Sequence, residues 1–377
     1  MTGRADYQSP HIRRSIRLSE IPMSTSWPTT ANAPPFEVTH PDTASLRAPL
    51  LDLWRRNLPT AAEHRFDWLY GSGRSRAWLL REQNALPIGA AGLLRRRTAV
   101  EGNVVEGGAP IDLNVDQAQR SIGPALTLAR TIINAADGDG LAILYGMPNR
   151  SATAVMKRAG YREIGEFSAW TKLLRTEPTL RSKLRSSWAS RLCAPLLDKA
   201  LHWSSAEWRT RLPANVVAKD ESRFDDRFDA LWLRTAEHFD VIGERTENYL
   251  SWRFSQCPDL NYQVFTLADR VTNELLGYVV WYADEGGVSI SDLLAVDDRS
   301  TPLLLAEFSR RARREGMAAI RLDCFGSTRF YRQLQLAGFH RRQNRHPVLC
   351  RFGGEVREQT RAGINWFLTM ADSDTDV

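Results

Sequence analysis

One stretch in the first third of the chain has the residue types and spacing of a phosphate-binding loop. Residues 111–116 (IDLNVD) alternate apolar and polar side chains, as a half-buried strand does. A short loop follows, and Gly123 and Pro124 stand where an amphipathic helix over 124–136 is expected to begin. The first N–H groups of a helix are unpaired and carry partial positive charge, and a glycine lets the backbone approach a ligand closely. The pattern therefore predicts a cradle for a phosphate or pyrophosphate.

Cysteine and histidine offer no comparable pattern. The four cysteines, Cys193, Cys257, Cys324 and Cys350, form no C-x-x-C pair, and the seven histidines are scattered. No zinc spacing results, so we expect no metal, and reduced, mostly buried thiols indicate a cytoplasmic protein. A catalytic Cys–His pair stays open as an alternative.

The elements around this loop recur in the second half of the chain. Paired strands at 77–81 and 88–94 match 262–267 and 275–282, and strand 111–115 matches 288–296. The helices and strands that follow match in the same order: 124–136 with 302–314, 142–145 with 320–324, and 151–159 with 328–337. Order, type and spacing agree, which indicates an internal duplication with a period of about 180 residues.

The duplication divides the 377 residues into five segments. We expect a disordered leader at 1–35, an N-terminal domain at 36–174, a basic helical connector at 175–215, a second domain at 216–352 and a tail at 353–377 that is frayed beyond Met370. The connector is rich in arginine and lysine, and its tryptophans and leucines, from Trp188 to Trp203, recur at helical spacing. It packs between the domains or, through residues 181–211, rests on an anionic membrane surface.

Composition limits the partners. Hydrophobic residues make up 43% of the chain, charged residues 25%, and the net charge is +6, which is globular and favours anionic ligands. No apolar run reaches the roughly 18 residues of a spanning helix. No compact basic motif with interleaved aromatic residues stands out, which argues against nucleic acid as a partner.

Arg120-Ser121-Ile122-Gly123-Pro124-Ala125 resembles the R/Q-x-x-G-x-G/A signature of the GNAT superfamily of acetyltransferases. Asn149 followed by Gly160-Tyr161 resembles the second segment of that family. The whole chain resembles tandem-GNAT proteins of bacterial exopolysaccharide or cell-surface polysaccharide synthesis, which share runs like 249–254 (YLSWRF) and 366–374 (WFLTMADSD). The resemblance implies an α/β (α+β) fold of two GNAT-like domains, each a mixed twisted sheet flanked by helices.

The resemblance also implies acetyl-CoA or another acyl-CoA as cosubstrate, bound in the first domain. The implied contacts are backbone N–H groups to the pyrophosphate, an arginine to phosphate, and a strand edge and an amide to the pantetheine arm. The residues concerned are Leu113, Val115, Arg120, Ser121, Ile122, Gly123, Ala125 and Asn149. Asn149 also fits a helix N-cap, Gly123 an ordinary helix start and Arg120 a solvated side chain.

Catalysis by such enzymes uses a carboxylate as base and a tyrosine as proton donor. Asp112 and Asp116 are the candidate bases, although both also fit the polar face of a half-exposed strand. The tyrosine position is Met156 here and Leu334 in the second copy, so the usual donor is absent and Tyr161 and Tyr145 are fallbacks.

The second copy has lost the glycine of the signature, since Asp298-Arg299-Ser300-Thr301-Pro302 stands in its place. We expect this copy not to bind CoA. Asp292, Asp297, Asp323 and Tyr331 stand where an acceptor could be touched, and each also fits a plain surface position.

The sequence favours an N-acyltransferase acting on an amine of a sugar nucleotide or surface-polysaccharide precursor. A CoA-binding scaffold of polysaccharide assembly and a tRNA-dependent aminoacyltransferase with the same duplicated fold remain alternatives.

Overall fold

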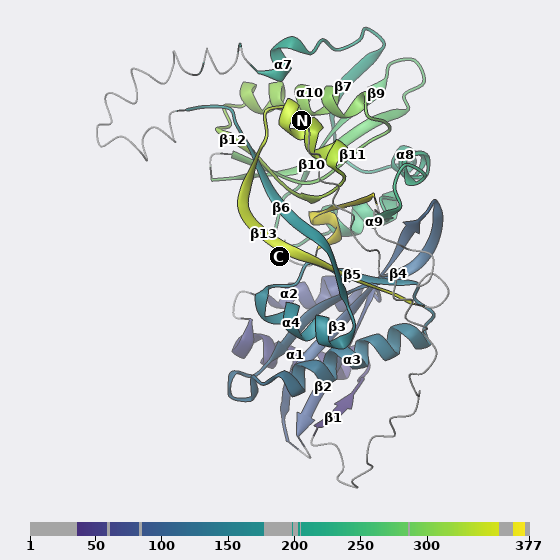
Figure 1. The fold of residues 1–377 in the computed structure, drawn as a ribbon, viewed down its shortest axis with the longest axis vertical. Helices are drawn as coiled ribbons and strands as arrows, with labels where there is room; N and C mark the ends of the chain where they lie inside the picture. Colours follow the sequence, from purple (N-terminus) through teal and green to yellow (C-terminus); the bar gives the residue numbers. More distant parts are fainter. Residues whose placement is uncertain are drawn as a thin grey trace, which may run out of the picture. The chain divides into compact units, whose positions relative to one another are not determined.

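The computed structural model describes residues 36–58, 61–82, 85–176, 198, 203, 205–285, 287–353 and 365–373. Residues 36–176, here called the first half, contain the predicted phosphate-binding loop and the elements around it (Figure 1). In order they are β1 (Phe36–Thr39), α1 (Thr43–Asn57), α2 (Glu63–Phe66), η1 (Asp67–Gly71), β2 (Ser75–Glu82), β3 (Pro87–Val100), β4 (Asn103–Val115), η2 (Gln117–Gln119), α3 (Ile122–Gly138), β5 (Ile143–Gly146), α4 (Arg150–Ala159) and β6 (Arg162–Leu173).

Residues 205–353, the second half, repeat this order, and a C-terminal segment at 365–373 follows. The elements are α7 (Ala206–Arg209), β7 (Val216–Glu221), α8 (Asp226–Ala236), β8 (Val241–Gly243), α9 (Glu247–Leu250), η3 (Ser251–Ser255), β9 (Gln263–Asp269), β10 (Leu275–Asp284), β11 (Gly287–Ala295), α10 (Ser300–Arg314), β12 (Ala319–Phe325), α11 (Thr328–Leu336), β13 (His340–Phe352), β14 (Trp366–Thr369) and η4 (Met370–Asp372). The leader and most of the predicted connector lie outside the described residues, as does Cys193.

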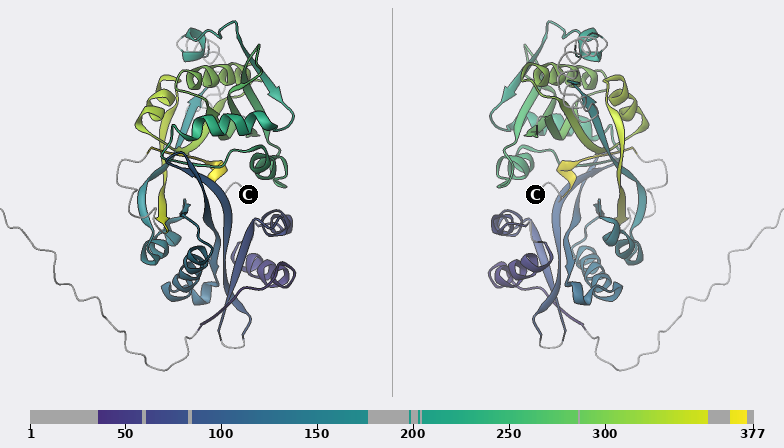
Figure 2. Two further views of the ribbon diagram at one scale, coloured as in Figure 1. Left: turned by 90° about the vertical axis from the view of Figure 1, so that its right-hand side faces the viewer. Right: turned by 90° about the vertical axis from the view of Figure 1, so that its left-hand side faces the viewer.

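Strand β2 shows why helices cover both faces of the first-half sheet. Its residues Ala77 and Leu79 belong to one core cluster with α1, whereas Trp78 and Leu80 belong to another with α3. Successive strand residues point to opposite faces, so an unbroken apolar run requires cover on both sides. Figure 2 shows α1 and α3 on opposite sides of these strands.

The strands of both halves join in one 14-stranded sheet, twelve of them in the order β1-β2-β3-β4-β5-β13-β6-β12-β11-β10-β9-β7. The other two lie off this path: β14 pairs with β12 and β8, and β8 also pairs with β3. The two long strands that end the halves are exchanged. β13 of the second half pairs with β5 of the first, and β6 of the first half pairs with β12 of the second. Each half therefore completes its sheet with a strand from the other half.

A pair of tryptophans marks the symmetry of the repeat. Trp68 in η1 and Trp252 in η3 stack with ring centroids 5.0 Å apart. Each indole N–H donates to the other residue's backbone carbonyl, at 2.9 and 3.2 Å. This reciprocal pattern is what a two-fold relation between the halves produces, and it buries both rings in the main core.

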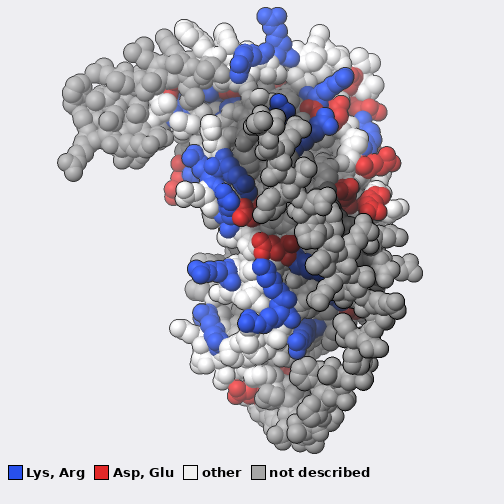
Figure 3. Space-filling model, viewed as in Figure 1, with Lys and Arg blue, Asp and Glu red and all other residues white. Residues whose placement is uncertain are grey.

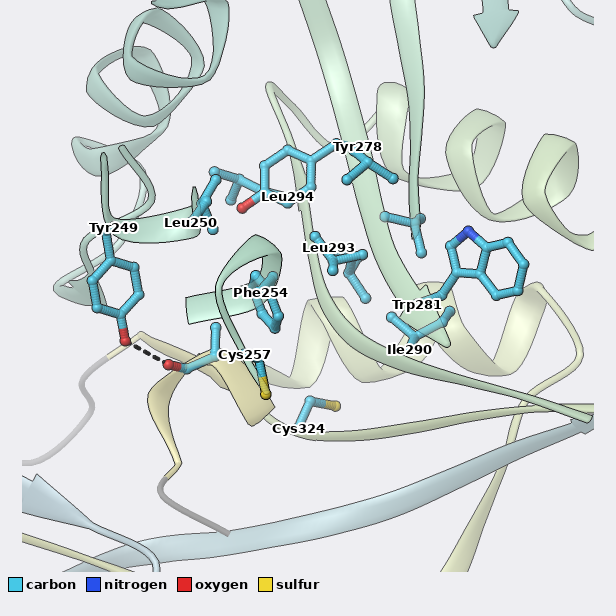
Figure 4. Close-up of a cluster of buried hydrophobic side chains, with 14 of the residues drawn as sticks. Tyr249, Leu250, Phe254, Cys257, Tyr278, Trp281, Ile290, Leu293, Leu294 and Cys324 are labelled. Carbon is cyan, nitrogen blue, oxygen red and sulfur yellow. Dashed lines mark hydrogen bonds between the residues drawn. The ribbon is translucent and has the colours of Figure 1, made fainter. Parts of the chain in front are cut away.

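The C-terminal segment is buried, which corrects the expectation of a frayed end beyond Met370 for residues 371–373, whereas 374–377 lie outside the described residues. Ala371 and Asp372 are 0% and 1% exposed. Tyr249 donates a hydrogen bond of 2.7 Å to the carbonyl of Ala371, beside the apolar cluster of the second half (Figure 4). The acidic Asp372 is accommodated because the guanidinium groups of Arg245 and Arg96 contact it at 2.5 and 3.1 Å.

Candidate active site in the first-half cleft

The candidate site begins where two parallel strands separate. β4 and β5 pair only through Gly107 with Ile143 and Gly108 with Leu144. Beyond these residues β4 bends away at a bulge, where the register with β3 shifts. Asp112 forms this bulge in the left-handed region, with φ 52°. The bend leaves a cleft between the carboxyl ends of β4 and β5.

A cavity of about 520 Å³ occupies this cleft. It is lined by the end of β4, the loop into α3, the end of α1 and the start of α4. The lining residues are Asn57, Leu58, Leu113, Asn114, Val115, Arg120, Ser121, Ile122, Ala125, Asn149, Ser151, Ala152, Ala154 and Val155. Seven of the eight residues predicted to contact a coenzyme therefore lie around one cavity, and the eighth, Gly123, lies among them in the first turn of α3.

The first turn of α3 is open toward ligands. Ser121 is the N-cap residue, but its side chain makes no capping hydrogen bond. A Cβ added at Gly123 would meet only the Ser121 hydroxyl, at 4.0 Å, so the space in front of this backbone is empty. Arg120 folds back toward the carbonyl of Val115 at 3.4 Å, and its exposed guanidinium stays at the cavity. Unpaired N–H groups and a cation thus face the same space.

Asn149 is the N-cap of α4, as one interpretation of the sequence held, because its side chain accepts a hydrogen bond of 2.9 Å from the Ala152 N–H. It also lines two cavities, the cleft cavity and a second of about 220 Å³. The second cavity contains Asp323 and His346 of the second half and Met370 and Ser373 of the C-terminal segment. Asn149 therefore stands at the boundary between the cleft and the second half.

Asp112 lies outside this cavity and has buried partners. Its carboxylate accepts from the Arg65 guanidinium at 3.0 Å and from the Tyr70 hydroxyl at 2.6 Å. Its side chain is 3% exposed. A base has to reach the amine. The role of Asp112 as base stays a prediction, and its partners favour the role of fixing the bulge.

Asp116 ties the loop to α1. Its carboxylate accepts from Asn57 at 2.9 Å and forms an ion pair with Arg56. These contacts hold the strand end and the loop in register with the helix that lines the cavity. Its role as base also stays a prediction.

No tyrosine lines the cavity among the described residues. Met156 is buried on α4. Tyr161, which follows α4, and Tyr145 on β5 are also buried. Burial raises the pKa of both hydroxyls well above the ordinary value. Neither fallback donor is placed to protonate a leaving group at the cleft.

The second half contains a matching cleft with different contents. β11 and β12 pair in parallel from Val288 to Ile290 only, and then separate. Here β14 fills the gap, since Thr369 and Leu368 pair with Cys324 and Phe325 of β12. A cavity of about 350 Å³ remains, and its lining includes Asp297, Asp298 and Phe367. Asp298 forms an ion pair with Arg329, whereas Asp297 accepts hydrogen bonds from the Arg299 and Ser300 N–H groups at the start of α10, at 3.0 and 2.7 Å. This occupied helix start and the inserted strand agree with the expectation that this half does not bind CoA.

Sequence reasoning missed several lining residues. Asn57 and Leu58 end α1, and nothing in their local sequence points to a ligand. Ser151 and Ala152 follow Asn149, the N-cap of α4. Their small side chains leave the strand ends uncovered, and this was the signal in the sequence that could have identified them as lining residues. The described residues contain no group of His, Cys, Asp and Glu arranged to hold a metal ion.

Solved structures with similar folds support this description. A GCN5-related N-acetyltransferase from Anabaena variabilis ATCC 29413 matches with a TM-score of 0.62 and 11% identity, over 84% of this chain and 72% of that one. The chain has the GNAT fold. A probable N-acyltransferase of unknown function from Enterococcus faecalis V583 matches with a TM-score of 0.63 and 12% identity, over 86% and 73% of the two chains. Saccharomyces cerevisiae N-myristoyltransferase, solved with myristoyl-CoA, matches with a TM-score of 0.52 and 12% identity, over 85% and 80%.

These matches confirm the predicted α/β fold of GNAT type. The sequence matches no protein-family model and no curated protein. Within the part of the chain that the structure describes, no helix is both long and apolar enough to cross a membrane.

Proposed function

We propose that the protein is an acyl-CoA-dependent N-acyltransferase that binds its cosubstrate in the first-half cleft. The observation that carries the proposal is the open cavity of about 520 Å³ between the separated ends of β4 and β5, in front of the uncapped start of α3. The names of similar structures support it, since they include N-acetyltransferases and a myristoyltransferase with bound myristoyl-CoA.

The cleft has a group for each part of the coenzyme. The N–H groups of Ile122 and Gly123, which have no partner within α3, bind the pyrophosphate, and Arg120 adds a charge-assisted contact. The edge of β4 from Leu113 to Val115 binds the pantetheine amides, because β5 does not pair with it there. The thioester then lies toward Asn149 and the second cavity.

Transfer requires one bond to form and one to break. The neutral amine attacks the thioester carbonyl, the new N–C bond forms, and the C–S bond breaks to release the coenzyme as thiolate. The amine proton passes to a base. Because Met156 replaces the tyrosine of the resembling enzymes, we infer that the thiolate leaves without a dedicated acid.

The proposed acceptor is an amine on a sugar nucleotide or surface-polysaccharide precursor, acetylated in the cytoplasm. This rests on the likeness of residues 249–254 and 366–374 to the tandem-GNAT proteins of polysaccharide synthesis. The structure gives these two runs one location, since Arg253 donates to the carbonyls of Met370 and Ser373.

A second candidate is a CoA-binding scaffold without turnover, which the replacement of tyrosine by Met156 favours. Binding of acetyl-CoA with transfer to an amino sugar supports the enzyme. Binding without transfer to any amine supports the scaffold. No binding at all favours a tRNA-dependent aminoacyltransferase.

The substitution Gly123→Glu tests the cleft. A carboxylate at this position faces the pyrophosphate, and like charges in contact cost several kcal/mol, so acetyl-CoA affinity should fall about 100-fold or more by calorimetry. An acidic residue at a helix start stabilises the helix, so the loss would not reflect unfolding. Gly138→Glu, at the other end of α3 with nothing within 4 Å of its added Cβ, is the matched control. Equal affinity in the two variants would contradict the assignment.

A further inference from the structure

Three cavities follow one another from the first half into the second. The cleft cavity and the 220 Å³ cavity share Asn149. The 220 Å³ cavity and a third of about 330 Å³ share Ala169, Asp323 and Met370. We call the second and third together the seam cavities, because β6 and β12 form their wall where the halves exchange strands.

Asp323 stands at the junction of the two seam cavities. It lies on β12 opposite Ala169 of β6, and its half-buried carboxylate accepts no hydrogen bond from a described residue. Burial raises the pKa of this carboxyl, against the opposing influence of His346 and Arg321. A desolvated carboxylate without a fixed partner has the properties of a general base.

The charged and titratable groups around Asp323 are few. Those lining the seam cavities are His346 and Arg342 from β13, Arg321 from its own strand and the Tyr282 hydroxyl from β10. The adjacent Cys324 thiol is buried, and burial together with Asp323 raises its pKa well above the ordinary value. The residues contributed by β6, β11 and η4 are uncharged. Asp323 is thus the single anionic group among the lining residues that the structure describes.

The far end of the seam cavities is basic. Arg321 forms an ion pair with Asp284. On β13, Arg341 and Arg345 pair with Glu166, whereas Arg342 pairs with no described acidic residue. Figure 3 shows Lys and Arg side chains gathered over β6 and β13. An anionic group entering the third cavity would meet Arg342 and Arg321.

We propose that the seam cavities bind the acceptor, a primary amine that also carries a phosphate or carboxylate group, with its amine at Asp323 and its anionic group at Arg342 and Arg321. The inference rests on the proposed function, since Asn149 joins this site to the cleft where the thioester arrives. Asp323 accepts the proton that the amine loses as the N–C bond forms. The electrons of the C–S bond leave with the coenzyme thiolate, so the step needs no further reactant.

The base is tested with Asp323→Asn in the full chain, using acetyl-CoA and glucosamine 6-phosphate. The amide keeps the shape and loses the basicity, so kcat should fall about 100-fold while the dissociation constant of acetyl-CoA stays unchanged. In the wild type, kcat should fall as pH drops through the raised pKa of Asp323, because only the carboxylate accepts a proton. This acid limb should be absent from the variant. Asp226→Asn, in the exposed first turn of α8, is the matched control.

The anionic preference is tested with glucosamine 6-phosphate against glucosamine. The phosphate ester should have a KM at least about tenfold lower, and Arg342→Gln should raise that KM about tenfold without changing the KM of glucosamine. Equal KM values for the two amines, or a kcat of Asp323→Asn equal to that of the wild type, would overturn this inference. Failure of the wild type to bind acetyl-CoA would instead overturn the proposed function, and binding without transfer to either amine would favour the scaffold.

Discussion

The same geometry opens a cleft in each half of the molecule, and the two clefts differ in what occupies them. In the first half, β4 and β5 separate in front of an uncapped helix start and Arg120, and a cavity remains. In the second half, β11 and β12 separate in the same way, but β14 pairs with β12. The loop that follows β11 places Asp297 and Asp298 at the cavity that remains in the second half.

The comparison teaches that a duplicated fold preserves its strand geometry more strictly than its ligand chemistry. The bend of β4 in the first half and that of β11 in the second both serve packing. A buried aspartate lies at each register shift and has an arginine partner: Asp112 with Arg65 at 3.0 Å and Asp292 with Arg245 at 2.9 Å. The glycine and the free helix start remain only in the first half, where a ligand can enter.

The largest effect is expected from breaking the buried ion pair of the second half. Arg245→Met leaves Asp292 its hydrogen bonds from Tyr278 and Thr369 but no described cation. It also removes one of the two cations on Asp372. Leaving a buried charge unpaired costs about 4 kcal/mol, measured as a loss in the free energy of unfolding in urea.

The matching substitution in the first half is Arg65→Met, which leaves Asp112 its hydrogen bond from Tyr70. It involves one carboxylate rather than two, so its cost should be smaller. A larger loss for Arg65→Met than for Arg245→Met would show that the halves do not differ in the way described.

The next effect concerns the strand that fills the second cleft. Phe367 is 3% exposed and lines the cavity there. Phe367→Ala should lower the free energy of unfolding by about 3 kcal/mol through lost packing. It should leave the number of acetyl-CoA sites per chain unchanged, because the Asp297 carboxylate still occupies the N–H groups at the start of α10. A new coenzyme site in this variant would show that β14 alone excludes the ligand.

The smallest effect is expected from the arginines of the two loops, Arg120 in the first half and Arg299 in the second. Arg120→Ala removes a charge-assisted contact and should weaken acetyl-CoA binding about tenfold in calorimetry. Arg299→Ala changes the arginine of the second-half loop, which is exposed, and should leave affinity unchanged. Equal losses in both variants would point to the overall positive charge of the protein rather than to the first cleft.

Local patterns were sufficient to predict the strands and helices next to the loop and its counterpart in the second half. The strands predicted at 111–115 and 77–81 fall within β4 and β2, although β4 begins at Asn103 and is much longer than predicted. The helix expected over 124–136 spans Ile122–Gly138. Seven predicted contact residues line one cavity because the loop and the two strand ends are close in sequence.

Contacts between residues that are far apart in the chain could not be predicted from the sequence. The exchange of β6 and β13 depends on backbone pairing between residues well over a hundred positions apart, and side-chain alternation does not specify a partner strand. The polar appearance of 370–373 hid a buried turn, because Asp372 is compensated by arginines far away in the chain. For the same reason Asp112 looked available as a base, whereas Arg65 and Tyr70 occupy its carboxylate.

The most direct test of the central claim is the stoichiometry of acetyl-CoA binding to the full chain by isothermal titration calorimetry. The account predicts one site per chain, since the first cleft is open and the second is filled by β14. Two sites per chain, or no heat of binding at all, would contradict it.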